Sequence, residues 1–298
     1  MAAFGPFVRE SWVSDRVAAL LEPDDIRAGE RIYGEGEPAE FIYFMRSGRV
    51  ELTRAGAPPW QIEGRWTLGT FDAFVERSRT RTAVALEDLQ LMKLRSDAWI
   101  DLLEDSFDLA HAAVTQSARV VAKLEAEHLA RGGAPAQAAS LSVALPEGRL
   151  NLVERLAVLL DLGMLRGAGV QTLVNLASST TEVSFSEGQA VLERGAAREQ
   201  MVLVMAGEVE ASREDPHVVA RYGPGTVVCD AAAFGEPSLA WAARAAAPTR
   251  ALTIRVESWF DQMEEHFDLV RAFLGAAAVR REWLLEQVAA EQGELVMR

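Results

Sequence analysis

The sequence predicts an α+β protein built from two jelly-roll-like β-rolls, each flanked by helices. Three observations support this fold class. The 298-residue chain consists of two halves with similar sequences, each half carries short apolar strands separated by glycines, and each half ends in an amphipathic helix. A chain of this length can bury two cores of ordinary domain size. Two domains are therefore the expected organisation.

The internal repeat is visible as glycines at matched positions in AGERIYGEGEPAEFIYFMRSGRVEL (28–52) and EGQAVLERGAAREQMVLVMAGEVEA (187–211). These glycines lie 159 residues apart (188 − 29 for the first pair): Gly29, Gly36 and Gly48 against Gly188, Gly195 and Gly207. A second match follows at an offset of 160, where WIDLLEDSFDL from Trp99 and WFDQMEEHFDL from Trp259 share six residues. Such a register across two halves is hard to obtain by chance, so we treat the halves as copies of one unit.

Short strands and tight turns are expected within each copy. The first copy offers FIYFM (41–45) and RVEL (49–52), and the second offers AVL (190–192), MVLVM (201–205) and EVEA (208–211). Glycines at the corners between them permit positive φ, which β-branched residues resist. Strands of this length at this spacing indicate a small β-barrel or β-roll.

Helices are expected around the strands of the second copy. Residues 151–165 and 170–179 are amphipathic and predict helices that lead into its β region. Residues 258–291 predict one long exit helix that begins at Ser258 as N-cap. Its apolar residues Trp283, Leu284 and Val288 are candidates for a partner surface or for packing within the chain.

A stretch rich in Ala, Gly, Ser and Pro separates the two copies. It predicts a linker over residues 132–148, between a first domain of residues 1–131 and a second domain of residues 149–298. Gly167-Ala-Gly169 is interpreted as a turn between two helices rather than a phosphate loop, because no strand precedes it and Thr172 stands where the third glycine would be.

Composition excludes several classes of function. The formal net charge of −14 disfavours direct DNA binding, which uses basic surfaces. There is no apolar run long enough to cross a membrane and no leader segment, so a soluble, cytoplasmic protein is expected. The single cysteine, Cys229, allows no internal disulfide, and the four histidines are scattered, so no metal site is expected. No nucleophile motif or cofactor loop is visible, so no catalytic residues are assigned and the protein is not expected to be an enzyme.

A glycine-punctuated β-roll between a lead-in helix and a longer exit helix resembles the cyclic nucleotide-binding domain. This is the sensor module of catabolite activator proteins, of regulatory subunits of cyclic-AMP-dependent kinase and of nucleotide-gated channels. Residues 28–52 and 187–211 look like the family's Gly-Glu, Gly-(Asp/Glu), Gly-x-Val pattern, and the resemblance covers nearly the whole chain in two copies. The DNA-binding domain of the catabolite activators is not expected, because the 29 residues after Leu269 continue the exit helix.

The resemblance also implies where a ligand would bind. Family members hold it with a phosphate-binding cassette, Phe-Gly-Glu-Leu-Ala-Leu followed by Pro-Arg-Ala-Ala, in which glycine admits the phosphate, glutamate holds the ribose and arginine pairs with the phosphate. Aligned on it, the first copy keeps Gly69 and, ten residues later, Arg79, while Thr70 replaces the glutamate. The candidate ligand-binding residues are therefore Gly69, Thr70, Arg79 and Thr80. The nearby Arg77 and Arg81 are interpreted as solvated surface charges rather than further anion contacts.

The cassette of the second copy is degenerate. The offset of 160 places Cys229 at the glycine, Asp230 at the glutamate and Leu239 at the arginine, so the pocket lacks a cation and is predicted to be empty. Phe234-Gly235-Glu236 with Arg244 looks like a cassette in isolation, but this alignment makes it the turn that follows.

These observations favour a non-enzymatic regulatory or scaffold protein with weak or lost ligand binding. It would act on another protein or as a homo-oligomer, without a cofactor, direct DNA binding or membrane binding. The alternative is a sensor that binds cyclic AMP, cyclic GMP or another anionic nucleotide, such as a cyclic dinucleotide, in the first domain. The inhibitory Arg-Arg-x-(Ala/Ser) segment of kinase regulatory subunits is not found ahead of the first copy.

Overall fold

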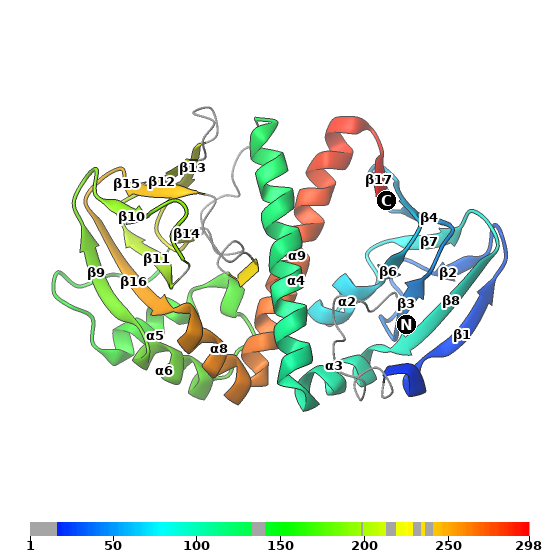
Figure 1. Cartoon of the computed structure of the whole chain (residues 1–298), viewed down its shortest axis with the longest axis horizontal. Coiled ribbons are helices and arrows are strands. Elements are labelled where there is room, and N and C mark those ends of the chain that lie inside the picture. The colour runs from blue at the N-terminus through cyan, green and yellow to red at the C-terminus, as the bar shows by residue number, and fades with distance from the viewer. Residues whose placement is uncertain are drawn as a thin grey trace. The chain divides into compact units, whose positions relative to one another are not determined.

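The computed structural model describes residues 17–132, 141–197, 199–212, 219–228, 234–235 and 241–297. The chain forms two compact units (Figure 1). The first unit combines residues 1–113 with residues 278–298, and the second consists of residues 114–277. The limits of the units fall within two long helices, α4 (Phe107–Ala130) and α9 (Phe267–Gln292).

The first unit is a β-roll of two sheets. Its strands are β1 (Glu22–Ile26), β2 (Arg31–Tyr33), β3 (Phe41–Met45), β4 (Arg49–Thr53), β5 (Trp60–Glu63), β6 (Trp66–Leu68), β7 (Thr82–Ala85), β8 (Leu89–Arg95) and β17 (Leu295–Met297). One sheet has the order β1-β8-β3-β6 and the other the order β17-β5-β4-β7-β2. All pairs are antiparallel except β17 with β5, which is parallel.

The second unit repeats this topology. Its strands are β9 (Thr181–Phe185), β10 (Ala190–Leu192), β11 (Gln200–Ala206), β12 (Val209–Ser212), β13 (Val219–Tyr222), β14 (Val227–Val228), β15 (Ala242–Ala245) and β16 (Thr249–Arg255). The sheet orders are β9-β16-β11-β14 and β13-β12-β15-β10, which match the first unit strand for strand apart from β17. The predicted fold class of two β-rolls flanked by helices is therefore confirmed.

Each roll has its own apolar core. In the first unit the inward positions of the strands are filled by large side chains that include Ile42, Met45, Trp60, Ile62 and Leu91. In the second unit Val202, Val204, Val209, Ala211 and Ala251 are among the buried residues of one cluster. Burial of this surface is the main driving force for folding each roll.

The exit helices differ from the prediction in one respect. We expected one helix from Ser258, but α8 (Val256–Glu265) starts two residues earlier and the extended backbone of His266 (φ −135°, ψ 90°) separates it from α9. Ser258 therefore lies inside α8 and caps nothing. The first unit has the same break at Ser106, between α3 (Ser96–Asp105) and α4, where the Ser106 hydroxyl accepts a hydrogen bond from the Leu109 N–H (3.4 Å).

The predicted lead-in helices of the second roll are confirmed as α5 (Leu152–Leu160), the 3-10 turn η2 (Gly163–Leu165) and α6 (Val170–Ser178). A capping box starts α5: the Asn151 side chain accepts from the Glu154 N–H (3.1 Å), and the Glu154 carboxylate accepts from the Asn151 N–H (2.7 Å). Gly167 (φ 100°) and Gly169 form the turn between η2 and α6, as expected.

The predicted linker, residues 132–148, lies partly in the described ranges, and its limits stay a prediction. Its last residues are held on the second roll by Arg250, which donates to the carbonyl oxygens of Pro146 (2.7 Å) and Gly148 (2.8 Å). Arg250 also pairs with Glu182 (2.7 Å), whose other carboxylate oxygen accepts from the Leu150 N–H (2.8 Å). The chain between residues 146 and 150 is therefore fixed against the strands that follow it.

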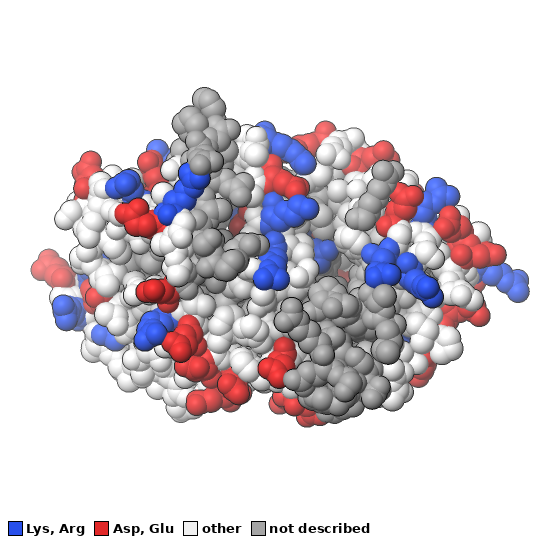
Figure 2. Space-filling view, in the orientation of Figure 1, with Lys and Arg blue, Asp and Glu red and all other residues white. Residues whose placement is uncertain are grey.

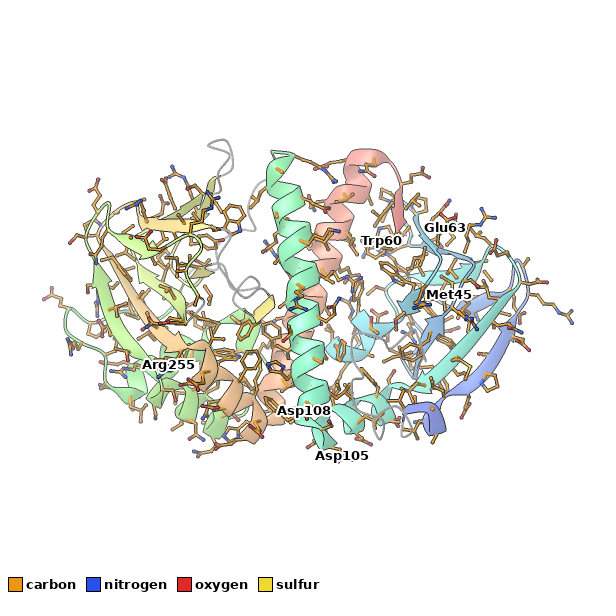
Figure 3. The ribbon with its side chains drawn as sticks, viewed as in Figure 1. Met45, Trp60, Glu63, Asp105, Asp108 and Arg255 are labelled. Carbon is orange, nitrogen blue, oxygen red and sulfur yellow. The ribbon has the colours of Figure 1, made fainter. Side chains whose placement is uncertain are left out.

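The residues after α9 form a strand that the sequence did not predict. Gly293 ends the helix in the left-handed region (φ 78°), where its N–H donates to the Ala289 carbonyl (2.9 Å), and a glycine tolerates this conformation best. The chain then turns into β17, which pairs with β5 in the register Leu295 to Trp60 and Met297 to Ile62. Figure 1 shows β17 against the strands of the first unit, and Figure 3 labels Trp60 next to it.

The surface carries charges of both signs. Acidic and basic side chains are interspersed on the face shown in Figure 2. Of the helices in the described ranges, none has the length and apolar character needed to cross a bilayer. Two of the three apolar residues proposed as a partner surface on α9 are buried, Leu284 at 1 % and Val288 at 9 % exposure, so they are not available for a partner in this structure.

Candidate functional site

The candidate site of the first unit begins where β6 meets a short helix, α2 (Thr70–Val75). Gly69 joins them in the left-handed conformation (φ 82°) as the N-cap of α2. A Cβ atom at this position would lie 2.2 Å from Nη1 of Arg79. Both the backbone conformation and the close approach of Arg79 therefore require glycine here.

Arg79 is bound to the protein itself. The residue is 3 % exposed, and its guanidinium donates to the Gly69 carbonyl oxygen (3.0 Å) and to the Phe41 carbonyl oxygen. The same group lies over the ring of Tyr33 (4.3 Å to the centroid) and 3.9 Å from the Asp72 carboxylate. Arg79 and Gly69, which the sequence assigns to one cassette, are therefore in contact, and two nitrogen atoms of the guanidinium donate to backbone carbonyls.

A small cavity adjoins Gly69. Three of the predicted site residues, Gly69, Thr70 and Thr80, line it together with aromatic and C-terminal side chains, whereas Arg79 does not. Its volume is about 40 Å³, enough for a few water molecules. The cavity cannot hold a nucleotide without movement of its walls.

One wall of the cavity is a network around Glu282 of α9. Arg77 donates to the carboxylates of Asp72 (3.0 Å) and Glu282, and the Thr80 hydroxyl donates to Glu282 (3.1 Å). Burial raises the pKa of Asp72, although the hydrogen bond and charge of Arg77 act in the opposite direction. Glu282 is 7 % exposed, so this carboxylate is buried among the residues that we predicted for an anionic ligand.

A second ion-paired group lies around Glu286, one helical turn further along α9. The Glu286 carboxylate accepts from Arg54 (2.5 Å) and lies 3.5 Å from Arg81. Arg81 stacks over Trp60 (3.8 Å to the centroid) and donates to the Pro58 carbonyl (3.3 Å). Burial and the neighbouring charge of Arg54 lower the pKa of Arg81. The expectation that Arg81 is a solvated surface charge was wrong, because it is 4 % exposed.

Arg281 completes the α9 side of the site. Its guanidinium lies over the rings of Phe71 (4.9 Å) and Trp66 (5.6 Å), and burial lowers its pKa to about 10. It stays protonated at neutral pH, so the aromatic faces act as its partners. Sequence reasoning missed Glu282, Glu286 and Arg281, since their spacing within a helix gives no sign of contacts made some 200 residues away.

The degenerate second pocket falls outside the described residues. This holds for Cys229, Asp230 and Leu239, and also for Glu236 of the apparent second cassette. Phe234 is described and packs against the ring of Phe273 (4.8 Å between centroids), so it is a core residue. The prediction of an empty second pocket therefore stays a prediction.

Gly235 and Arg244, the other described residues of the apparent second cassette, both contact other parts of the protein. A Cβ atom on Gly235 would lie 2.7 Å from the backbone nitrogen of Arg119, and the Gly235 carbonyl accepts a hydrogen bond from the Arg119 side chain. Arg244 lies in β15 opposite Ala190 and Glu210, and its guanidinium donates a hydrogen bond to the Gly188 carbonyl (3.4 Å).

Comparison with known proteins agrees with the topology. The sequence profile of the cyclic nucleotide-binding domain matches the chain twice, over residues 23–106 and 182–266. A curated relative from Mycobacterium tuberculosis, a CRP-like cAMP-activated global transcriptional regulator, is 28 % identical over 112 residues, which are 35 % of this chain and 50 % of the relative. The chain therefore spans half the length of the curated relatives it matches.

Solved structures of similar fold include the regulatory subunit of a cAMP-independent protein kinase A from Trypanosoma brucei. It is 12 % identical, with a TM-score of 0.34, and the match covers 96 % of this chain and 85 % of that one. The sensor domain of the transcriptional regulator DNR from Pseudomonas aeruginosa is 17 % identical, with a TM-score of 0.39, and the match covers 42 % of this chain and 91 % of that domain.

Proposed function

The chain belongs to the cyclic nucleotide-binding domain family, in two copies, and from this premise we propose that it is a non-enzymatic regulatory protein whose first domain has little or no affinity for cyclic nucleotides. It would act through contacts with another protein or with a second copy of itself. The observation that carries this proposal is the position of Arg79, whose guanidinium donates to two backbone carbonyls of its own domain.

The energetics of Arg79 support this proposal. A phosphate at Gly69 would compete with the carbonyls of Gly69 and Phe41 for Arg79, and each charge-assisted bond of this kind is worth about 1.5–3 kcal/mol. Thr70 offers no carboxylate for a ribose hydroxyl. The buried carboxylate of Glu282 lies in the cavity wall and already binds Arg77 and Thr80, which are then not available to an anionic ligand.

The charge of the chain and the exposed apolar residues of α5 favour a protein partner over DNA. The formal net charge of −14 argues against direct contact with DNA, and a cytoplasmic location fits a regulatory role of this kind. Support for a protein partner comes from α5, where Val153 (72 % exposed) and Leu160 (58 % exposed) lie seven residues apart, on one face of the helix.

Isothermal titration with cyclic AMP, cyclic GMP and cyclic di-GMP tests the proposal. We expect no binding by the wild-type chain at micromolar ligand, and no difference in the Arg79→Ala or Arg79→Lys variants, whose folding is checked by circular dichroism. Micromolar binding that disappears in both variants would contradict the proposal.

That contrary result would establish the second candidate function, a sensor that binds a cyclic nucleotide in the first domain. One observation favours it: Gly69 and Arg79 keep the spacing of the family cassette and touch each other, and Thr70 and Thr80 line the adjoining cavity. Binding would then require Arg79 to exchange carbonyl partners for a phosphate.

A further inference from the structure

Residues 278–297, here called the C-terminal segment, are docked on the first β-roll. The segment consists of the last turns of α9, the turn at Gly293 and the strand β17. It belongs to the same compact unit as residues 1–113, although more than 160 residues of the chain lie between them. Two kinds of contact hold it.

The first kind of contact is ionic. Glu282 pairs with Arg77 and accepts from Thr80, while Glu286 pairs with Arg54 and Arg81. Residues four apart in a helix share a face, so the two carboxylates meet the roll side by side. The segment therefore presents a pair of negative charges to three arginines.

The second kind of contact is strand addition. β17 extends the sheet beyond β5, and the Leu295 N–H donates to the Pro59 carbonyl (3.1 Å). Leu295 and Met297 are buried, at 6 % and 8 % exposure, whereas Val296 between them is 42 % exposed. This alternation is the pattern of a peptide that adds to a sheet edge and places every second side chain in a pocket.

The surface under the segment is held in place by its own contacts. Arg81 is fixed by Trp60 and the Pro58 carbonyl, and Arg77 by Asp72, all of which lie outside the segment. Without Glu282 and Glu286, Arg77 would keep the Asp72 carboxylate, whereas Arg54 and Arg81 would lose the Glu286 carboxylate that they share. The roll therefore keeps a positively charged sheet edge that calls for an acidic ligand.

Two of the three arginines of this edge are features of the first copy alone. At the offset of 159 that relates β4 to β12, Arg54 corresponds to Arg213, whereas at the offset of 160 Arg77 and Arg81 correspond to Pro237 and Trp241, which carry no positive charge. β13, which corresponds to β5, is the last strand of its sheet in the described ranges. In the described ranges the second β-roll therefore forms without an added strand next to β13. A roll of this kind does not need the pairing seen between β17 and β5 in order to fold.

We propose that the β5 edge, with Arg54, Arg77 and Arg81, is a recognition site for an acidic helix–strand peptide, and that the chain's own C-terminal segment occupies it. The peptide it takes has two carboxylates one helical turn apart, followed by a short strand with apolar residues at alternate positions. This inference rests on the proposal that the chain acts through protein contacts, and it names one site for such a contact and the chemistry of its ligand.

Peptide binding in trans tests the site. In the full chain, Glu282→Lys with Glu286→Lys should release the segment by charge repulsion, and hydrogen exchange of the 295–297 amides should show lost protection. A fluorescein-labelled peptide of residues 278–297 should then bind this variant at least tenfold more tightly than the wild type, whose site is occupied. If the charge reversal prevents folding, Glu282→Gln with Glu286→Gln serves in its place.

Two matched peptides make the result specific. A peptide with Gln at positions 282 and 286 should lose at least tenfold in affinity, and a peptide with Glu291→Gln, an exposed position, should bind like the original. The proposal is overturned if the folded variant with an unprotected segment fails to bind the peptide, or if the 295–297 amides stay protected after charge reversal. Nucleotide titration is a separate measurement, so either proposal can fail alone.

Discussion

Replacing Gly69 with alanine perturbs the junction between the backbone of the site and Arg79. The substitution places a methyl group 2.2 Å from Nη1 of Arg79, and it forces an alanine into a conformation with φ near 82°. Flexible side chains often move away from such a contact. Arg79 cannot do so easily, because its side chain is 1 % exposed and held by two carbonyls and an aromatic ring.

Gly69→Ala destabilises the protein in two ways, through the strained backbone of the alanine and through the displacement of Arg79. A non-glycine residue in the left-handed region costs about 1–2 kcal/mol. Displacing Arg79 breaks at least one hydrogen bond from a charged donor, which adds about 1.5–3 kcal/mol. We therefore expect Gly69→Ala to lower the free energy of unfolding by about 2.5–5 kcal/mol.

Gly56 provides the control. It has nearly the same backbone conformation (φ 73°), but a Cβ atom there would meet no other atom within 4 Å, so Gly56→Ala should cost only the conformational part, about 1–2 kcal/mol. Urea unfolding followed by tryptophan fluorescence measures both variants. Repeating Gly69→Ala in an Arg79→Met background should reduce its effect to that of Gly56→Ala. Equal losses for the two alanine variants in the wild-type background would refute the role assigned to Arg79.

Two further substitutions test the second roll. Asn151→Ala removes the capping box of α5 and should lower the free energy of unfolding by about 1 kcal/mol, measured by urea denaturation; an unchanged midpoint would show that the cap is dispensable. Although burial acts to raise it, hydrogen bonds from Leu150 and Arg250 hold the pKa of Glu182 below its ordinary value, so its contribution to stability is full above the unfolded-state pKa and is lost as pH falls through the folded-state pKa. Glu182→Gln should therefore destabilise most at neutral pH and progressively less below about pH 4, where a pH-independent difference would contradict the assignment.

Much of the fold could be predicted because its signals are local or repeated. Glycines at Gly48 and Gly207 mark turns in both copies, and the offset between the copies carries over to whole strands, as in β8 and β16. The helix break at His266 could not be predicted, since neither proline nor glycine marks it. Its equivalent in the first copy, Ser106, is a capping residue whose role becomes visible only in the structure.

The contact between Gly69 and Arg79 could be expected from the sequence, but the hydrogen-bond partners of Arg79 could not. The ten-residue spacing placed Arg79 beside Gly69, yet no local pattern tells whether a buried arginine faces a ligand or a backbone carbonyl. The pairing of Glu282 with Arg77 joins residues 205 positions apart, and charges that distant leave no periodic trace in a sequence. Three residues, Leu295–Met297, are likewise too short a run to predict a strand.

The parallel pairing of β17 with β5 also bears on how the chain is made. Leu295 meets Trp60 across 235 residues (295 − 60), so β5 emerges from the ribosome long before its neighbour is synthesised. Domains generally fold as they are produced, and during this interval the nascent first roll exposes an unpaired strand edge, which can pair with other chains and aggregate. Rapid elongation of the second half, or a chaperone bound at that edge, would shorten or cover the exposure.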